Sequence, residues 1–253
     1  MAKNKLARFR ENLTFPYLHQ PTFDSVWRAP YPLQGQWAAQ QFSNQNPITL
    51  ELGCGRGEYT VALAQAAPEQ NYIGMDIKGA RLWVGARAVK EQGLTNVAFV
   101  RARIETLTSF FAPNEIAHLW LTFPDPQLKE RRAKKRLTGE RFLELYSRIL
   151  APSGVIHLKT DSRELYDFTL NEVATIGGRV LYAADNIDNI LEQFPLLRIS
   201  TYYERYFRER GKTICYLEFG LPEHWKAIGE SEVWQSPCEF WLGETHKDGL
   251  EEE

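Results

Sequence analysis

The sequence predicts an α/β fold in which a mostly parallel sheet carries helices on both faces. Three observations support this prediction. Short apolar, β-branched runs alternate with helix-like segments from residue 46 onward, which is typical of parallel sheets. Three glycines at alternate positions, Gly53, Gly55 and Gly57, separate the first run from the first helical segment. Acidic residues stand at the ends of later strand-like runs, and the carboxyl ends of parallel strands lie at one edge of a sheet.

The boundaries of the elements follow from the period of the apolar residues and from the turn residues between them. Strands are expected over residues 48–52, 71–76, 97–102, 116–123, 155–161, 179–183 and 212–219. Helices are expected over residues 58–67, 79–92, 105–111, 138–150 and 164–176. Gly93 should end the second helix, and Thr138 should cap the start of the fourth.

One domain with two extensions accounts for the 253 residues. Residues 1–45 form a basic and aromatic arm, which we expect to pack on the domain with a mobile first dozen residues. The domain itself covers residues 46–220. Residues 221–253 form a tail with an acidic end, which we expect to be partly docked through its tryptophans.

Charge, cysteines and histidines exclude several classes of protein. The net charge of −2 provides no global field for nucleic-acid binding. Three separated cysteines and five scattered histidines signal neither a disulfide framework nor a metal site. With no secretory leader and no apolar run that could cross a bilayer, we expect a cytoplasmic protein without membrane contact. The sequence leaves open whether the chain is a monomer or a homodimer.

The glycine-rich turn predicts the cofactor. A dinucleotide fingerprint has glycine at its sixth position, where this chain has Glu58, and no Lys-Ser/Thr pair follows to make a P-loop. Glu51 stands just before the turn. Carboxylates there would repel a pyrophosphate but suit a cation, and S-adenosylmethionine carries a sulfonium, an ammonium and a ribose diol. We therefore favour it over NAD or ATP, with a purely structural turn as the alternative.

Residues after the next two strands would complete a nucleoside site. Asp76 ends the second strand, where an acid can accept both hydrogen bonds of a ribose diol. The adenine edge should be read after the third strand, but Arg103 stands there and cannot accept a hydrogen bond. Either the backbone at Ile104 or the side chain of Glu105 would then make this contact.

The substrate side of the predicted site lies after later strands. Asp125 is bracketed by two prolines, which suits a side chain that must be placed rigidly. Six basic residues and one acid follow over residues 129–136, which points to a polyanionic substrate. Asp161 ends another strand, and the tyrosines and arginines of residues 201–210 can stack on an exposed base.

Together these motifs resemble the bacterial tRNA (guanine-N7-)-methyltransferase family. The matching segments are residues 33–37, 51–57, 74–76, 123–137, 159–161 and 201–204. The resemblance implies a Rossmann-like class I methyltransferase with a seven-stranded, mostly parallel sheet and an antiparallel late strand. It also implies S-adenosylmethionine as the methyl donor and a guanine in the variable loop of tRNA as the target.

The resemblance implies a role for individual residues as well. It makes Asp125 both catalytic and close to the cofactor. Cofactor binding is assigned to Glu51, Gly53, Gly55, Gly57, Asp76, Arg103, Ile104 and Asp125. Binding of the tRNA is assigned to Lys129, Asp161, Thr201, Tyr202, Tyr203 and Glu204. The chain departs from the family pattern at Asp76 (usually Glu), Arg103 (usually Asp) and Gln127-Leu128 (usually Trp-Pro).

The chemistry of the implied reaction fits these residues. Guanine N7 is a lone-pair nucleophile, so the site needs in-line placement rather than a strong base. Asp125 can offset the positive charge that moves onto the purine, and Asp125 and Asp161 can accept from the guanine N1–H and amino group. The alternatives are a class I methyltransferase for another structured RNA, a protein or a small molecule, a non-catalytic tRNA-binding module, and an NAD-dependent enzyme.

Overall fold

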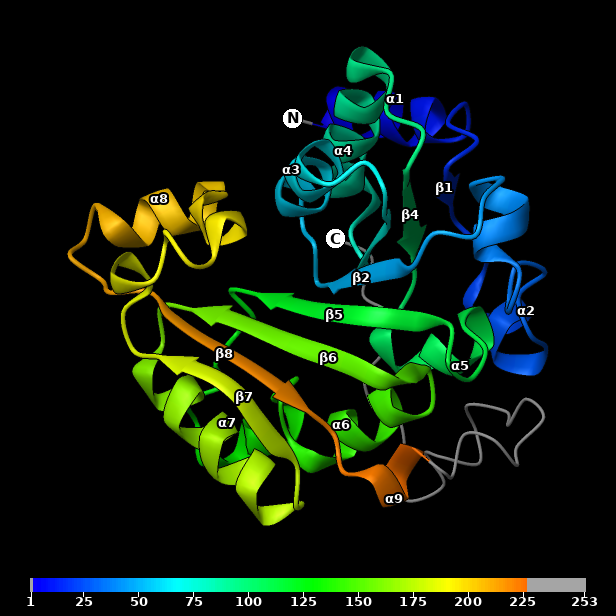
Figure 1. Ribbon diagram of the computed structural model, residues 1–253. Coiled ribbons are helices and arrows are strands. Elements are labelled where there is room, and N and C mark those ends of the chain that lie inside the picture. Colours follow the sequence, from blue (N-terminus) through cyan, green and yellow to red (C-terminus); the bar gives the residue numbers. More distant parts are fainter. Residues whose placement is uncertain (1, 227–253) are drawn as a thin grey trace.

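The computed structural model describes residues 2–226, which form an eight-stranded sheet with helices on both faces (Figure 1). The strand order is β1-β4-β3-β2-β5-β6-β8-β7, and only β8 runs antiparallel to its neighbours. The strands are β1 (Leu18–His19), β2 (Ile48–Leu52), β3 (Asn71–Asp76), β4 (Val97–Arg101), β5 (Ile116–Thr122), β6 (Leu150–Thr160), β7 (Arg179–Ala184) and β8 (Cys215–Gly220). The predicted parallel sheet with an antiparallel late strand is confirmed.

The predicted count of seven strands is wrong by one. The eighth strand, β1, comes from the arm and pairs in parallel with β4, with Leu18 opposite Phe99. The backbone N–H of Phe99 also donates to the carbonyl of Tyr17 at 2.7 Å. A two-residue strand is too short to carry a period of apolar residues, so only its pairing partner reveals it.

The helices agree with the prediction within the domain, with additional helices in the arm, before β8 and after β8. They are α1 (Ala2–Asn12), α2 (Phe23–Arg28), α3 (Glu58–Ala66), α4 (Gly79–Gln92), α5 (Leu107–Phe110), α6 (Glu140–Ser147), α7 (Arg163–Thr175), α8 (Tyr202–Arg208) and α9 (Glu223–Lys226). Gly93 ends α4 in the left-handed conformation, as predicted. Thr138 does not cap α6: Gly139 occupies that position, and the buried Thr138 hydroxyl accepts from Thr169 instead.

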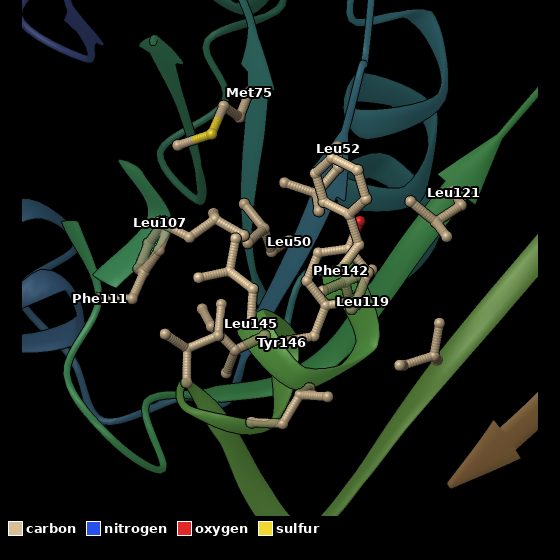
Figure 2. Close-up of a cluster of buried hydrophobic side chains, with 14 of the residues drawn as sticks. Leu50, Leu52, Met75, Leu107, Phe111, Leu119, Leu121, Phe142, Leu145 and Tyr146 are labelled. Carbon is tan, nitrogen blue, oxygen red and sulfur yellow. The ribbon is translucent and has the colours of Figure 1, made fainter. Parts of the chain in front are cut away.

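Two apolar clusters cover the two faces of the sheet. Figure 2 shows the first, in which Leu50, Leu52, Leu119 and Leu121 of the strands meet Phe142, Leu145 and Tyr146 of α6 and residues around α5. On the other face, α3 and α4 pack over Tyr72, Phe99 and Trp120. Because side chains alternate along a strand, Glu51 lies on the face opposite Leu50 and Leu52 and points toward α3.

The arm is held against the rest of the protein by specific contacts. Trp37 is fully buried, and its indole N–H donates to the carbonyl of Phe110 at 2.8 Å. Residues 2–12, which we expected to be mobile, form α1 beside α4, where Trp83 donates to Glu11 and the guanidinium of Arg8 lies 4.4 Å from its ring centre. The tail beyond residue 226, with the expected docking of its later tryptophans, lies outside the described residues.

The described residues show neither a membrane-spanning helix nor a cluster of metal-binding side chains. No helix within residues 2–226 has the length and apolarity needed to span a membrane. The same residues contain no group of three or more His, Cys, Asp or Glu side chains arranged to hold a metal ion.

Candidate active site

The glycine-rich turn joins β2 to α3 at the carboxyl edge of the sheet. Gly53, Gly55 and Gly57 all have positive φ, at 70°, 56° and 70°. A Cβ at Gly57 would lie 2.6 Å from the Phe99 ring, so glycine is required there for packing. A Cβ at Gly53 or Gly55 would meet nothing within 4 Å, so the backbone at these positions faces open space that a ligand can approach closely.

Glu51 is a buried carboxylate at the base of the turn. It is 2% exposed and accepts hydrogen bonds from the Thr60 amide at 2.9 Å and from the hydroxyls of Thr60 and Thr122. Burial raises the pKa of Glu51 to about 7, although the hydrogen bonds from both threonines favour the ionised form. A cationic ligand would complete this site by replacing the lost hydration of the carboxylate.

Asp76 ends β3 and ties that strand to the turn. One carboxylate oxygen accepts from the Gly55 amide at 3.0 Å, and the other accepts from the Lys78 amide at 2.7 Å. These backbone contacts fix the orientation of the carboxylate and leave further lone pairs for a diol. Ile77, which the sequence analysis did not single out, follows with 57% of its side chain exposed and offers an apolar surface beside Asp76.

A cavity of about 530 Å³ opens beside the turn and collects residues from five parts of the chain. The turn contributes Glu51, Gly53, Cys54, Gly55, Arg56 and Glu58, and the loop after β5 contributes Thr122, Phe123, Pro124, Asp125 and Pro126. Arg81 of α4, Asp161 after β6, and Thr201, Tyr202, Tyr203 and Phe207 of the α8 segment complete the lining. The structure therefore brings together eight of the predicted site residues at one cavity.

Asp125 lies on a loop whose backbone is held in an unusual conformation. Phe123 and Gln127 have φ of 50° and 46°, in the left-handed region that non-glycine residues seldom adopt. The Phe123 amide donates to the carbonyl of Lys159 at 2.7 Å, and the Gln127 amide donates to the Asp125 carboxylate at 3.0 Å. The Asp125 side chain is exposed at the cavity wall, where a substrate can reach it.

The α8 segment is anchored through a buried ion pair. The Lys159 ammonium, at the end of β6, contacts the Glu204 carboxylate at 2.7 Å and donates to the carbonyls of Leu197 and Ile199 at 2.9 and 2.8 Å. Lys159 is fully buried and Glu204 is 2% exposed. Burial lowers the pKa of Lys159, and the Glu204 carboxylate opposes that shift. These contacts hold α8 beside the carboxyl ends of the strands.

Glu204, which the resemblance assigns to tRNA binding, does not line the cavity, and its carboxylate contacts Lys159 and Arg208. Helix α8 was not expected from the sequence. The sequence does carry a pattern for the start of this helix, because Thr201 is followed three positions later by Glu204, as in a capping box. In the structure the Thr201 hydroxyl accepts from the Glu204 amide at 3.2 Å.

Aromatic residues of α8 close the cavity opposite the glycine turn. Tyr202 and Tyr203 are 46% and 43% exposed, and Phe207 stacks on Phe123 with ring centres 6.0 Å apart. The Tyr202 amide donates to the Glu58 carboxylate at 2.6 Å, and the Arg56 guanidinium lies 5.1 Å from the Tyr202 ring. The turn and α8 are thus linked across the cavity.

Arg103, Ile104 and Lys129 do not line the cavity. Arg103 is exposed to solvent in part and lies 3.6 Å from Glu105, while Ile104 packs against the apolar core. Lys129 is exposed and precedes the 3₁₀ helix η3 (Glu130–Lys135), which carries the basic run. Gly57 and Asp76 shape the turn without lining the cavity themselves.

Comparisons with known proteins show that the chain is similar in sequence to methyltransferases. A family described as putative methyltransferase matches residues 45–217. A Christiangramia forsetii protein named tRNA (guanine-N(7)-)-methyltransferase is 46% identical over 221 residues, which are 87% of this chain and 99% of the relative. A Porphyromonas gingivalis protein of the same name is 49% identical over 218 residues, which are 83% of this chain and 86% of the relative.

Solved structures show the same fold at low identity. The 16S rRNA methyltransferase KamB superposes with a TM-score of 0.55 at 14% identity, over 72% of this chain and 92% of its own. An antibiotic-related methyltransferase superposes with a TM-score of 0.56 at 18% identity, over 73% of this chain and 92% of its own. At these identities the likeness concerns the fold alone.

Proposed function

The chain belongs to the tRNA (guanine-N7-)-methyltransferase family, and on that premise we propose that it transfers a methyl group from S-adenosylmethionine to N7 of a guanine in tRNA. The observation that carries the proposal is the cavity where the glycine turn faces Asp125, Asp161 and the tyrosines of α8. One wall suits a cationic nucleoside, and the other suits an exposed purine. A variable-loop guanine is the proposed target, and the cytoplasm is the proposed site of the reaction.

The residues around the turn fit S-adenosylmethionine. Glu51 and Glu58 offer carboxylates to its ammonium and sulfonium, and Arg56 and Arg81 offer partners for its own carboxylate. Asp76 would accept from the ribose diol, as its position beside the Gly55 amide allows. When bound, the cofactor supplies an electrophilic methyl group. For the adenine edge we keep the backbone at Ile104 or the side chain of Glu105 as the proposed contact, and Arg103 stays among the residues assigned to cofactor binding.

The opposite wall would orient the guanine. Tyr202 and Tyr203 present exposed rings on which a base can stack. Asp125 and Asp161 line the cavity and would accept from the guanine N1–H and amino group, which adenine cannot offer in that arrangement. N7 needs no base to become a nucleophile, so these residues act by placement and by offsetting the positive charge that develops on the purine. Exposed cations of Lys129 and η3 would hold the RNA backbone.

One experiment tests the reaction, the cofactor and the substrate class together. The purified chain is incubated with unmodified transcribed tRNA and methyl-labelled S-adenosylmethionine, and the digested RNA is analysed by mass spectrometry. We expect labelled 7-methylguanosine, which guanine substitutions in the variable loop of the transcript should abolish. A different methylated nucleoside would overturn the assignment of N7, and transfer to a guanine elsewhere would overturn the variable-loop target.

The raised pKa of Glu51 predicts that cofactor binding is linked to proton release. A carboxyl with a pKa of about 7 is neutral below that pH, whereas a cationic ligand binds its ionised form. At pH 6 binding should therefore release about 0.9 proton from Glu51, and the contribution of this group should weaken affinity about tenfold for each pH unit below 7. Calorimetry in buffers of different ionisation enthalpy measures the released protons.

Glu51→Gln is the matched control for this linkage. The variant keeps the shape of the side chain but cannot titrate, so the difference in proton release between the two proteins isolates Glu51 from titration of the ligand. In the cofactor-free protein, the raised pKa of Glu51 also determines how the free energy of unfolding changes with pH. The free energy of unfolding of the glutamine variant, relative to wild type, should rise between pH 4.5 and about 7, because only the unfolded wild-type carboxyl ionises there. Equal proton release by both proteins would contradict the proposed contact.

A further inference from the structure

Arg136, the last cation of the basic run, points toward the loop of Asp125 (residues 123–127) rather than into solvent. Arg136 is partly buried, and its Nε and Nη2 atoms donate to the carbonyls of Pro126 and Gln127 at 3.2 and 3.5 Å. Its guanidinium carbon lies 4.3 Å from the ring centre of Phe168 in α7. The side chain is therefore packed on a helix on one side and bonded to the loop of Asp125 on the other.

The loop around Asp125 depends on contacts from outside itself. Left-handed φ angles at Phe123 and Gln127 each cost on the order of 1 kcal/mol or more. Pro124 and Pro126 have no backbone N–H, so two of the five residues from 123 to 127 cannot donate a stabilising hydrogen bond. The Phe123 amide secures the start of the loop on β6, and Arg136 secures its end through two carbonyls.

We propose that Arg136 is a positioning residue, which holds Asp125 in place for methyl transfer and does not bind phosphate. The proposal rests on the proposed function, since the reaction gives the position of Asp125 its meaning. Arg131, in the same basic run, differs from Arg136 in its exposure and in its contacts. Arg131 is exposed, and within residues 2–226 its side chain forms no hydrogen bond or ion pair, so it remains available to RNA. Arg136 thus joins an RNA-binding segment to the loop that carries the catalytic acid.

Arg136→Lys separates geometry from charge. Lysine keeps the positive charge, but its ammonium cannot present the planar pair of donors that reaches two carbonyls while stacking on Phe168. We expect kcat to fall by about tenfold or more, because small displacements of a reacting group carry large rate penalties. The affinity for tRNA and its dependence on salt should stay within about twofold of wild type.

Further variants make the comparison specific. Arg131→Ala should show the opposite pattern in binding, with weaker tRNA affinity and a salt slope lowered by about one. Arg179→Lys, the same chemical change at an exposed position of β7, should leave rate and affinity unchanged. If Arg136→Lys instead leaves kcat unchanged while Arg136→Ala lowers the affinity and the salt slope as Arg131→Ala does, Arg136 binds phosphate and the proposal is overturned.

A measurement without RNA tests the structural step by itself. The Gln127 amide donates to Asp125, so its hydrogen exchange reports whether the loop keeps its conformation. In cofactor-free protein, exchange at this amide should accelerate about tenfold or more in Arg136→Lys and stay unchanged in Arg179→Lys. Unchanged exchange in Arg136→Lys would overturn the proposal. Faster exchange in a protein whose product is not 7-methylguanosine would overturn the proposed function and leave Arg136 holding the loop.

Discussion

Replacing Asp125 with asparagine should lower the rate of methyl transfer by about 10²- to 10³-fold, the range found when one preorganised electrostatic group is removed from an active site. The physical reason is the charge that appears on the purine as N7 accepts the methyl group. Asp125 lies on the cavity wall with its carboxylate fixed by the Gln127 amide, so its charge is in place before the reaction begins. Asparagine has nearly the same shape and lacks that charge.

The measurement is a single-turnover assay with saturating tRNA and cofactor, together with calorimetric titration of S-adenosylmethionine. Cofactor affinity should remain within about threefold of wild type, because Glu51 and the turn supply the main partners of the cationic ligand. Asp167→Asn is the matched control, since Asp167 lies on α7 in an exposed ion pair with Arg163. Near-normal turnover by Asp125→Asn would remove Asp125 from the mechanism.

Replacing Lys159 with methionine should destabilise the protein by about 3 kcal/mol, the lower end of the usual cost of breaking a buried ion pair. The Glu204 carboxylate, which is 2% exposed, would keep its contact with Arg208 but lose the Lys159 ammonium, and the carbonyls of Leu197 and Ile199 would lose the hydrogen bonds that Lys159 donates. The free energy of unfolding from urea denaturation measures the loss. The segment before α8 should also lose protection from hydrogen exchange.

A double variant tells whether the pair is structural. Lys159→Met combined with Glu204→Leu removes both charges, and apolar replacement of a buried pair often restores stability. We expect the double variant to be clearly more stable than Lys159→Met alone. If Glu204→Gln left stability within about 0.5 kcal/mol of wild type and abolished tRNA methylation, Glu204 would contact substrate after all, and the reading of this pair as an anchor would be wrong.

The sequence by itself determined the sheet and the site residues that lie at the carboxyl ends of its strands. Runs of β-branched residues alternate with helical periods, and in a parallel sheet this places the ends of β2, β3, β5 and β6 at one edge. Glu51, Asp161 and, on the loop after β5, Asp125 all line the cavity at this edge. The turn could be predicted from its glycines because positive φ and close packing leave few other residues possible at these positions.

Only the tertiary structure decided the remaining features, because each depends on partners far apart in the chain. β1 exists through its pairing with β4, some 80 residues later. Glu204 is an anchor because Lys159 lies opposite it, 45 positions earlier. Arg136 contacts the loop of Asp125 because Phe168 and the carbonyls of Pro126 and Gln127 surround its guanidinium. The charge of a residue and the period of the apolar residues can be read from the local sequence. Whether a cation is buried, and therefore structural, depends on how the whole chain packs.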